Sequence, residues 1–462
     1  MTVPSKPLAI LVGIHLPDVS DVDFEASLAE LGRLVSTLGY SPEATVIQKR
    51  ENLSPAAVLG DGKLQDLAAL THGSGHTGTT VPRTKDKARM RREGASDGDE
   101  HDSDRDEDDE VESPYALVAV DHDISPSQAR NLERATGVQV LDRTGVIVEI
   151  FHRHAKSREA KLQVEIARLA YTAPRLRESP SGKERQQGRG AGEAALELDR
   201  RKIRDRIAEL REELELVQKD QDNRRAHRRE ARRVALVGYT NAGKSSLMRA
   251  LTGSEVYVED KLFATLDTTV RALHPEVKPR VLVSDTVGFI KKLPHDLVAS
   301  FKSTLDEAHE ASLLLHVVDA SDPTFRAQHE VTRKVLEEIG ATKVPTILVL
   351  NKADRVDETT ANALRREFPD ALFVSAHRPE GVAAVREAIL AYFDSTDVER
   401  TYLVPYAEQA KVAELHEHAR VLDEVYGEDG ARVRVRGDQD ILARLEKKGL
   451  RLAPLPEAEA SA

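Results

Sequence analysis

The stretch of sequence that decides the fold is Gly238-Tyr-Thr-Asn-Ala-Gly-Lys-Ser245. It follows an apolar run at 234–237 and precedes a run of helical character at 246–251. The spacing G-x-x-x-x-G-K-[S/T], between a strand and a helix, is that of a phosphate-binding loop. Its glycines let the backbone wrap around phosphate groups, so that N–H groups and the helix N-terminus face anionic oxygens. We therefore predict nucleotide contacts from Gly238, Tyr239, Thr240, Asn241, Ala242, Gly243, Lys244, Ser245 and Ser246.

A second motif, Asp285-Thr-Val-Gly288, ends the apolar run 281–285 and lies 41 residues after Lys244. We expect Lys244 to reach the β- and γ-phosphates, and we expect the Ser245 hydroxyl and the Asp285 carboxylate to hold Mg²⁺. The Gly288 N–H is placed to meet the γ-phosphate. These two motifs do not distinguish ATP from GTP.

Two later motifs favour guanine. Asn351-Lys-Ala-Asp354 and Ser375-Ala376 each end a strand-like run. The Asp354 carboxylate can accept hydrogen bonds from N1–H and the 2-amino group of guanine, whereas adenine has neither donor, so its binding would leave a buried charge unpaired. We expect Asn351 to join the loops, the Lys352 stem to cover the base and the Ala376 N–H to read the guanine oxygen. The four motifs occur in the right order at strand ends, where such sheets bind ligands, and they predict GTP or GDP with Mg²⁺.

A threonine that closes over the γ-phosphate and Mg²⁺ is expected between the first two motifs. The candidates are Thr265, Thr268 and Thr269, and we favour Thr265, also as a metal ligand. The alternative is that all three are ordinary loop threonines.

The residues expected to act in hydrolysis are Lys244, Thr265 and Gly288. Directly after Gly288 comes Phe289, where many GTPases carry a glutamine that orients the attacking water. An apolar ring cannot orient water, so we expect slow hydrolysis until a partner completes the site.

The fold class that these patterns predict is α/β, with four parts. Residues 1–155 alternate strand-like and helix-like runs and predict a small α/β subdomain. We expect strands at 8–14, 44–48, 116–121 and 138–142, with 146–151 a further candidate, and helices at 24–38, 63–70 and 125–136. The stretch 72–113 has few large apolar residues, so we expect a disordered insertion there, a solvated spacer in preference to a partner-binding tail.

Residues 156–231 predict a helical hairpin, because apolar residues at 203, 207, 210, 214 and 217 form a heptad seam. The connection 174–192 is rich in Gly and Pro and carries Arg175, Arg177, Lys183, Arg185 and Arg189, which we expect to contact RNA.

Residues 232–396 predict a P-loop GTPase domain on a mostly parallel sheet, with strands at 281–285, 313–319, 346–351 and 373–375. Residues 397–462 predict a small α+β domain with a flexible tail. Its expected elements are a strand at 401–405, a helix at 408–426, a strand at 431–436 and a helix at 439–448.

The composition limits the class of protein and its expected location. Charged residues make up 32% of the 462, there is no cysteine, and no apolar run approaches the ~20 residues that span a bilayer. The first residues lack a signal-peptide layout, so we expect a cytoplasmic protein without a membrane span. The net charge of -12 comes almost wholly from the acidic stretch 93–112, so it does not argue against an RNA partner for the folded parts.

The motifs together resemble the HflX family of translational GTPases. The similarity extends from Gly238–Ser245 to Leu262-Phe-Ala-Thr-Leu-Asp-Thr-Thr269 and Asp285-Thr-Val-Gly-Phe-Ile290, and also to Asp142-Arg-Thr144 and Glu159-Ala-Lys-Leu-Gln-Val-Glu165. The resemblance implies binding to the large ribosomal subunit and its RNA, and splitting or rescue of idle or stalled ribosomes under stress. It also implies that the ribosome stimulates hydrolysis. We expect a monomer when the protein is free.

Two other functions fit part of the pattern. A GTP-dependent ribosome-assembly or RNA-modification factor would share the nucleotide motifs, and a coiled-coil scaffold with a vestigial site would share the heptads. Intact Lys244, Ser245, Asp285 and Asp354 argue against the scaffold. Use of ATP, at a second site near residues 60–63, is a weaker alternative.

Overall fold

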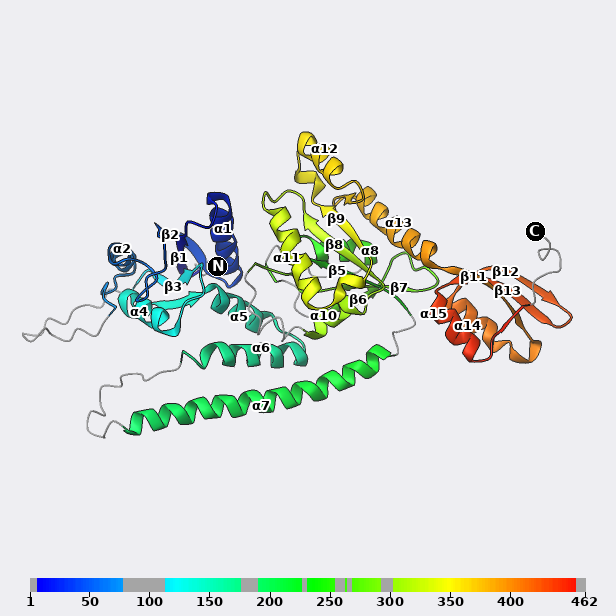
Figure 1. The fold of residues 1–462 in the computed structure, drawn as a ribbon, viewed down its shortest axis with the longest axis horizontal. Coiled ribbons are helices and arrows are strands. Elements are labelled where there is room, and N and C mark those ends of the chain that lie inside the picture. Colours follow the sequence, from blue (N-terminus) through cyan, green and yellow to red (C-terminus); the bar gives the residue numbers. More distant parts are fainter. Residues whose placement is uncertain are drawn as a thin grey trace, which may run out of the picture. The chain divides into compact units, whose positions relative to one another are not determined.

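The computed structural model describes residues 6–77, 113–175, 190–226, 231–253, 262–263, 268–291 and 302–453 (Figure 1). Thr265 and most of the predicted insertion lie outside these ranges. The chain divides into two compact units, Met1–Ile150 with Tyr171–Leu196, and Phe151–Ala170 with Glu197–Ala462. Within the described ranges, no helix is both long and apolar enough to cross a bilayer.

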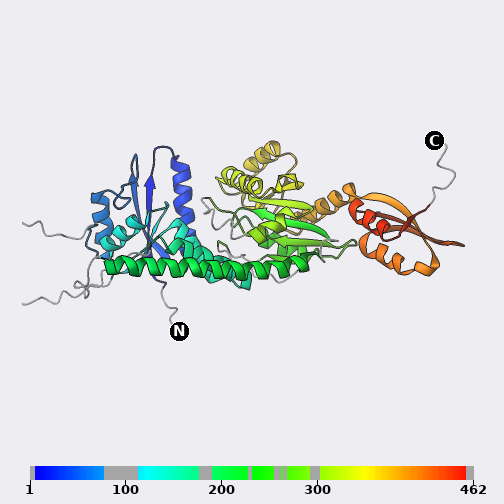
Figure 2. The ribbon, with the colours of Figure 1, turned by 60° about the horizontal axis from the view of Figure 1, so that its bottom comes forward.

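The first unit is built on four parallel strands in the order β2-β1-β3-β4. The strands are β1 (Leu8–His15), β2 (Ser41–Lys49), β3 (Tyr115–Val120) and β4 (Gln139–Asp142), and the helices are α1 (Asp21–Thr37), α2 (Asp61–Thr71) and α4 (Pro126–Thr136). Helices lie on both sides of the strands (Figure 2). Helices α2 and α4 bury Leu67 and Leu132 against Val12, while Gly32 of α1 approaches Leu11 on the other face.

Two sequence-based expectations in this region differ from the structure: one element type and one boundary. Residues 146–151, a candidate strand, belong to helix α5 (Arg143–His154). A short apolar run cannot be assigned by periodicity alone, and here Val146, Ile147, Ile150 and Phe151 are all fully buried, so the helix lacks the polar stripe that would mark it. The predicted insertion also begins too early, because Gly75 N–H donates to the Ala135 carbonyl at 2.9 Å.

Helices α6 (Arg158–Thr172) and α7 (Gly190–Ala226) pack against each other. The contact joins Leu162 and Ile166 of α6 to the heptad residue Leu210 of α7. Arg175 pairs with Asp142 at 2.7 Å and lies over the Tyr171 ring, and its contact with RNA stays a prediction. The other four basic residues of the connection lie outside the described residues.

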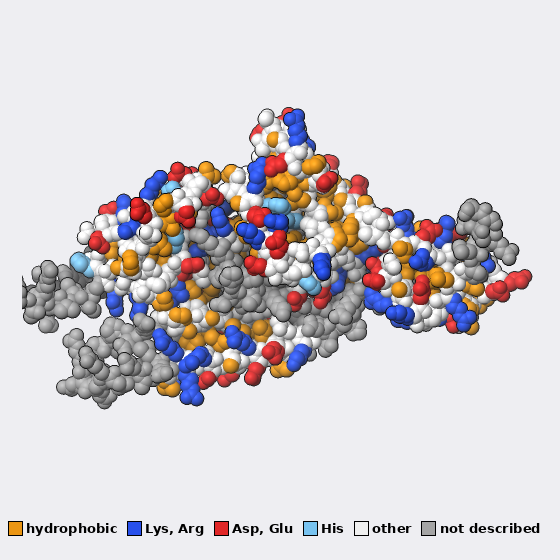
Figure 3. All heavy atoms as spheres, in the orientation of Figure 1, with side chains coloured by type: hydrophobic (Ala, Val, Ile, Leu, Met, Phe, Trp, Pro, Cys, Tyr) orange, Lys and Arg blue, Asp and Glu red, His pale blue; other side chains and the backbone are white. Residues whose placement is uncertain are grey.

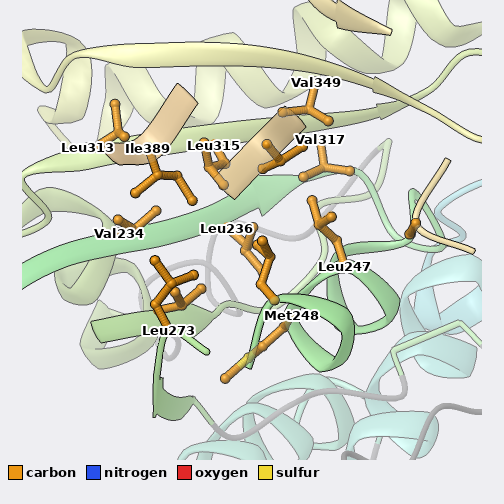
Figure 4. Close-up of a cluster of buried hydrophobic side chains, with 14 of the residues drawn as sticks. Val234, Leu236, Leu247, Met248, Leu273, Leu313, Leu315, Val317, Val349 and Ile389 are labelled. Carbon is orange, nitrogen blue, oxygen red and sulfur yellow. The ribbon is translucent and has the colours of Figure 1, made fainter. Parts of the chain in front are cut away.

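The GTPase sheet has the order β10-β9-β8-β5-β7-β6, and only β6 runs antiparallel to its neighbour. Its strands are β5 (Arg232–Gly238), β6 (Thr269–Ala272), β7 (Val281–Asp285), β8 (Leu313–Asp319), β9 (Thr346–Asn351) and β10 (Leu372–Phe373). Its helices are α8 (Lys244–Thr252), α10 (Lys302–His309), α11 (Phe325–Glu338), α12 (Glu358–Glu367) and α13 (Pro379–Thr396). Leu236, Leu315 and Val317 of the sheet pack against Met248 and Ile389 from α8 and α13 (Figure 4). The predicted α/β P-loop fold is confirmed.

The C-terminal module is a four-stranded antiparallel sheet in the order β12-β13-β11-β14. Its elements are β11 (Val398–Val404), α14 (Ala410–His418), β12 (Arg420–Gly427), β13 (Gly430–Gly437), α15 (Gln439–Lys447) and β14 (Arg451–Leu452). The helix predicted over 408–426 was wrong in its second half. Ala419 is extended (φ -139, ψ 160) and ends α14, and the β-branched and aromatic residues after it pair with β13 as a hairpin.

Candidate nucleotide site

The phosphate-binding loop begins at the carboxyl end of β5 and ends at the start of α8. Gly238 and Gly243 have φ of 150° and 94°. A Cβ on Gly238 would lie 2.1 Å from the Val317 carbonyl oxygen, and one on Gly243 would lie 2.2 Å from Asn351 Nδ2. Both positions therefore require glycine, for backbone conformation and for space.

Lys244 is folded back onto its own loop. Its ammonium donates to the carbonyls of Gly238 at 3.1 Å and Tyr239 at 2.9 Å, and the side chain is buried. Burial lowers the pKa of Lys244 to about 8, and the Asp285 carboxylate opposes that shift. The buried ammonium is thus held where nucleoside phosphates would supply stronger, anionic acceptors.

The two described residues predicted to hold Mg²⁺ lie together. Ser245 Oγ donates to Asp285 Oδ2 at 2.6 Å, and Asp285 is almost fully buried. A hydroxyl and a carboxylate are oxygen ligands of the kind Mg²⁺ takes alongside phosphates, so this pair fits the ion. Of the alternative threonines, Thr269 is in β6 and pairs with Asp285 in the sheet.

The loop after β7 is joined to the phosphate-binding loop by backbone hydrogen bonds. Phe289 N–H donates to the Gly238 carbonyl at 3.1 Å, and Thr240 N–H donates to the Phe289 carbonyl at 2.7 Å. A Cβ on Gly288 would lie 2.7 Å from Thr240 Cα and 3.0 Å from Lys244 Nζ. Gly288 is thus within reach of whatever Lys244 binds, whereas the Phe289 ring is buried and packs in the core.

Asn351 connects two loops from a fully buried position. Its Nδ2 donates to the Ala242 carbonyl at 2.9 Å, and its Oδ1 accepts from Ala376 N–H at 3.0 Å. The side chain thereby joins the phosphate-binding loop to the loop that carries Ser375 and Ala376.

Asp354 lies in a short 3-10 helix (Ala353–Arg355) directly after β9. A hydrogen bond from the Ser375 side chain holds the pKa of Asp354 below its usual value, so this carboxylate is ionised at neutral pH and can accept from guanine. Lys352 has a φ of 61° and pairs through Nζ with Asp319 at 2.7 Å.

The sequence reasoning missed Asp319. It ends β8 and lies opposite Asn351 in the sheet register, so its position at a strand's carboxyl end was the available signal.

Three further predicted residues lie in or beside the phosphate-binding loop. Tyr239 Oη accepts from Lys291 N–H at 2.7 Å, Asn241 has a φ of 59°, and Ser246 is in the first turn of α8. Their nucleotide roles stay predictions.

Comparison with known proteins places this site in a family. Models described as the GTP-binding GTPase N-terminal region, the GTP-binding GTPase middle region and the 50S ribosome-binding GTPase match residues 25–81 with 108–152, 154–228 and 233–352. A GTPase HflX of Gluconacetobacter diazotrophicus is 62% identical over 446 residues, which are 96% of this chain and 98% of the relative. The chain belongs to the GTPase HflX family. GTPases HflX of Caldanaerobacter subterraneus subsp. tengcongensis and Escherichia coli are 38% and 35% identical, covering 95% and 90% of this chain and 93% and 91% of their own lengths.

Membership in the HflX family confirms the resemblance drawn from the motifs. It also confirms that the protein is a GTP-hydrolysing enzyme that binds GTP and GDP.

Proposed function

We propose that this protein binds the large ribosomal subunit in its GTP-bound state and splits idle or stalled ribosomes under stress. The observation that carries the proposal is the match along nearly the whole chain to GTPases HflX, together with the match of residues 233–352 to the 50S ribosome-binding GTPase model. We further propose that the free protein is a cytoplasmic monomer with the four parts 1–155, 156–231, 232–396 and 397–462.

The phosphates would be bound by the loop at 238–246. Lys244, now bonded to two carbonyls of its own loop, would exchange them for the β- and γ-phosphate oxygens, a change that favours its charged form. Ser245 and Asp285, already 2.6 Å apart, would hold Mg²⁺, which when bound supplies positive charge to the phosphate oxygens.

The base would be selected by the loop pair that Asn351 joins. The Asp354 carboxylate, ionised at neutral pH, would accept from the two guanine donors. The Ala376 N–H donates to Asn351 Oδ1 in this structure, so it would have to share or leave that bond to donate to the guanine oxygen. An adenine there would leave the carboxylate without its partners, which costs more than the lost contacts alone.

Hydrolysis would be slow in the free protein. The Phe289 ring is buried in the core, so the residue that follows Gly288 cannot orient the attacking water. We propose that contact with the ribosome positions that water or the residues around it, so that GTP is hydrolysed after the subunits have separated and the protein is released.

The test is a sucrose-gradient analysis of purified 70S ribosomes incubated with the protein and GTP, GDP or a non-hydrolysable GTP analogue. The proposal predicts a shift from 70S particles to subunits with GTP and with the analogue, and little shift with GDP. The Lys244→Ala variant serves as the control. If 70S particles persist under all three nucleotides while the protein still binds GTP, splitting is not its function.

A further inference from the structure

The C-terminal module covers only one face of its sheet. Helices α14 and α15 pack Leu415, Leu442 and Leu445 onto that face, against Tyr402 and Val433 of the sheet. Within residues 397–453, which the structure describes, no helix covers the opposite face. Figure 3 shows Lys and Arg side chains at the surface of this module, among apolar and acidic ones.

The central strand β13 has a strict alternation of buried and outward side chains. Ala431, Val433 and Val435 are buried in the module's core, whereas Arg432 and Arg434 are exposed and Arg436 is half-buried. Because successive side chains of a strand point to opposite faces, these three arginines line the open face at intervals of roughly 7 Å.

Neighbouring strands add two arginines to the same face. Arg420 of β12 lies directly opposite Arg436, and Arg451 of β14 lies opposite Leu403, which in turn lies opposite Arg432. We call this set the arginine face: Arg420, Arg432, Arg434, Arg436 and Arg451.

The positive charge of the arginine face is only partly offset. Glu399 lies 3.6 Å from Arg434, and Asp423 lies opposite the same arginine in the register. Arg436 itself has Arg420 opposite it on one side and Glu399 on the other, and its guanidinium donates to the Asp394 carbonyl at 2.8 Å. The face still sets five arginines against two carboxylates of its own strands, a positive excess that an anionic partner would neutralise.

We propose that the arginine face binds the phosphate backbone of ribosomal RNA in the large subunit; this rests on the proposed function. Guanidinium groups bind phosphates through paired N–H donors, and a row of them suits a repeating anion. By the strand register, the described residues of this face include no aromatic side chain to stack on a base: the neighbours of the arginines are Glu399, Thr401, Leu403, Asp423 and Val425. The contact would hence position the module on RNA without reading its sequence.

The test compares two triple variants of the full-length protein. The first, Arg432→Gln with Arg434→Gln and Arg436→Gln, removes three charges from the arginine face. The matched control, Arg444→Gln with Lys447→Gln and Lys448→Gln, removes three exposed charges from the helical side of the same module. Affinity is measured against salt concentration for isolated large ribosomal subunits and for protein-free ribosomal RNA from them, and melting and basal GTP hydrolysis are recorded for each variant.

For the arginine-face variant we expect the slope of log affinity against log salt to fall by about two to three on both probes, with affinity reduced roughly ten- to a hundredfold at 0.1 M salt. The control variant should keep most of the wild-type slope, and basal hydrolysis should be unchanged in both. The arginine-face variant should melt at a slightly lower temperature, because Arg436 loses its hydrogen bond to the Asp394 carbonyl. If the triple variant does not fold, the double variant Arg432→Gln with Arg434→Gln replaces it, with an expected loss of slope of about one to two.

Three outcomes separate the alternatives. Equal affinity and slope for wild type and variant on both probes would overturn the proposal. A loss on intact subunits without a loss on free RNA would also overturn it, because the partner would then be an acidic ribosomal protein. If the wild type does not bind large subunits, the proposed function fails, and the free-RNA measurement still decides whether the arginine face binds RNA.

Discussion

Replacing Asn351 by Ala should destabilise the nucleotide-free protein as well as weaken nucleotide binding. The Asn351 side chain is buried, with the Ala242 carbonyl at 2.9 Å and the Ala376 N–H at 3.0 Å. Both partners are backbone groups of the site's own loops. The bonds exist before any nucleotide binds, so their loss should be measurable without one.

The magnitude follows from the two groups that the substitution leaves unpaired. A buried backbone donor or acceptor without its partner costs about 1–3 kcal/mol, so two of them give about 2–4 kcal/mol when some relaxation or entry of water is allowed for. Asn351→Asp separates hydrogen bonding from size. It keeps the bond to Ala376 N–H but sets a carboxylate oxygen against the Ala242 carbonyl oxygen, so it should destabilise at least as much as Ala.

The assay is denaturant unfolding of the nucleotide-free protein, with GDP affinity measured by calorimetry. Asn362→Ala, at an exposed asparagine of α12, is the control and should change stability by less than about 0.5 kcal/mol. A loss below about 0.5 kcal/mol for Asn351→Ala, or an Asn351→Asp variant as stable as wild type, would refute the argument that this side chain holds the loops together.

Three more predictions concern single residues. Lys244→Ala should abolish productive GTP binding, because it removes the ammonium that the loop holds for the phosphates; near-normal turnover would disprove the assignment. Asp354→Asn should weaken GTP binding and admit xanthine nucleotide, whose C2 oxygen can accept from the new amide, and an unchanged base preference in competition binding would mean that the base is read elsewhere. His316 is buried in β8, and its ring stacks on that of His329 with the centroids 4.7 Å apart. Burial lowers the pKa of His316 to about 3, so below pH 6.5 the unfolded state binds a proton at this residue and the folded state does not. Stability should therefore fall from pH 6.5 toward pH 4 by up to about 1.4 kcal/mol per unit from this group, and His316→Phe should be less steep by that amount in unfolding measured across this range; equal slopes would show that His316 does not contribute.

Local patterns were sufficient to predict the GTPase fold. The central strands β5, β7 and β8 are largely buried and read as apolar runs, and the motifs at strand carboxyl ends marked where loops converge. The edge strand β6 is only half-buried and carries an arginine, and it was not predicted. The same rule placed Asn351 correctly beside the phosphate-binding loop, because strands of a parallel sheet end at one edge. Asp354 lies beside Ser375, and its contact with the base stays a prediction. Asp319 was missed because it belongs to no motif: its position at a strand's carboxyl end was a signal, but its pairing with Lys352 shows only in the structure.

The arginine face was missed for a different reason. The alternation of Val and Arg at 431–436 correctly indicated a strand, but a strand alone does not show what lies beside it. A helix was expected over 408–426, which put Arg420 in the wrong kind of element and hid its place opposite Arg436. Pairing between strands depends on tertiary contacts that no local pattern specifies.

Co-sedimentation of the protein with isolated large ribosomal subunits tests the central claim most directly. The measurement compares GTP, a non-hydrolysable GTP analogue, GDP and no nucleotide, with Lys244→Ala as the variant that cannot use the site. The account predicts that the protein pellets with the subunits in GTP and most strongly in the analogue, but only weakly with GDP, and that Lys244→Ala loses the difference. Binding that is absent, or equal in all four conditions, would contradict it.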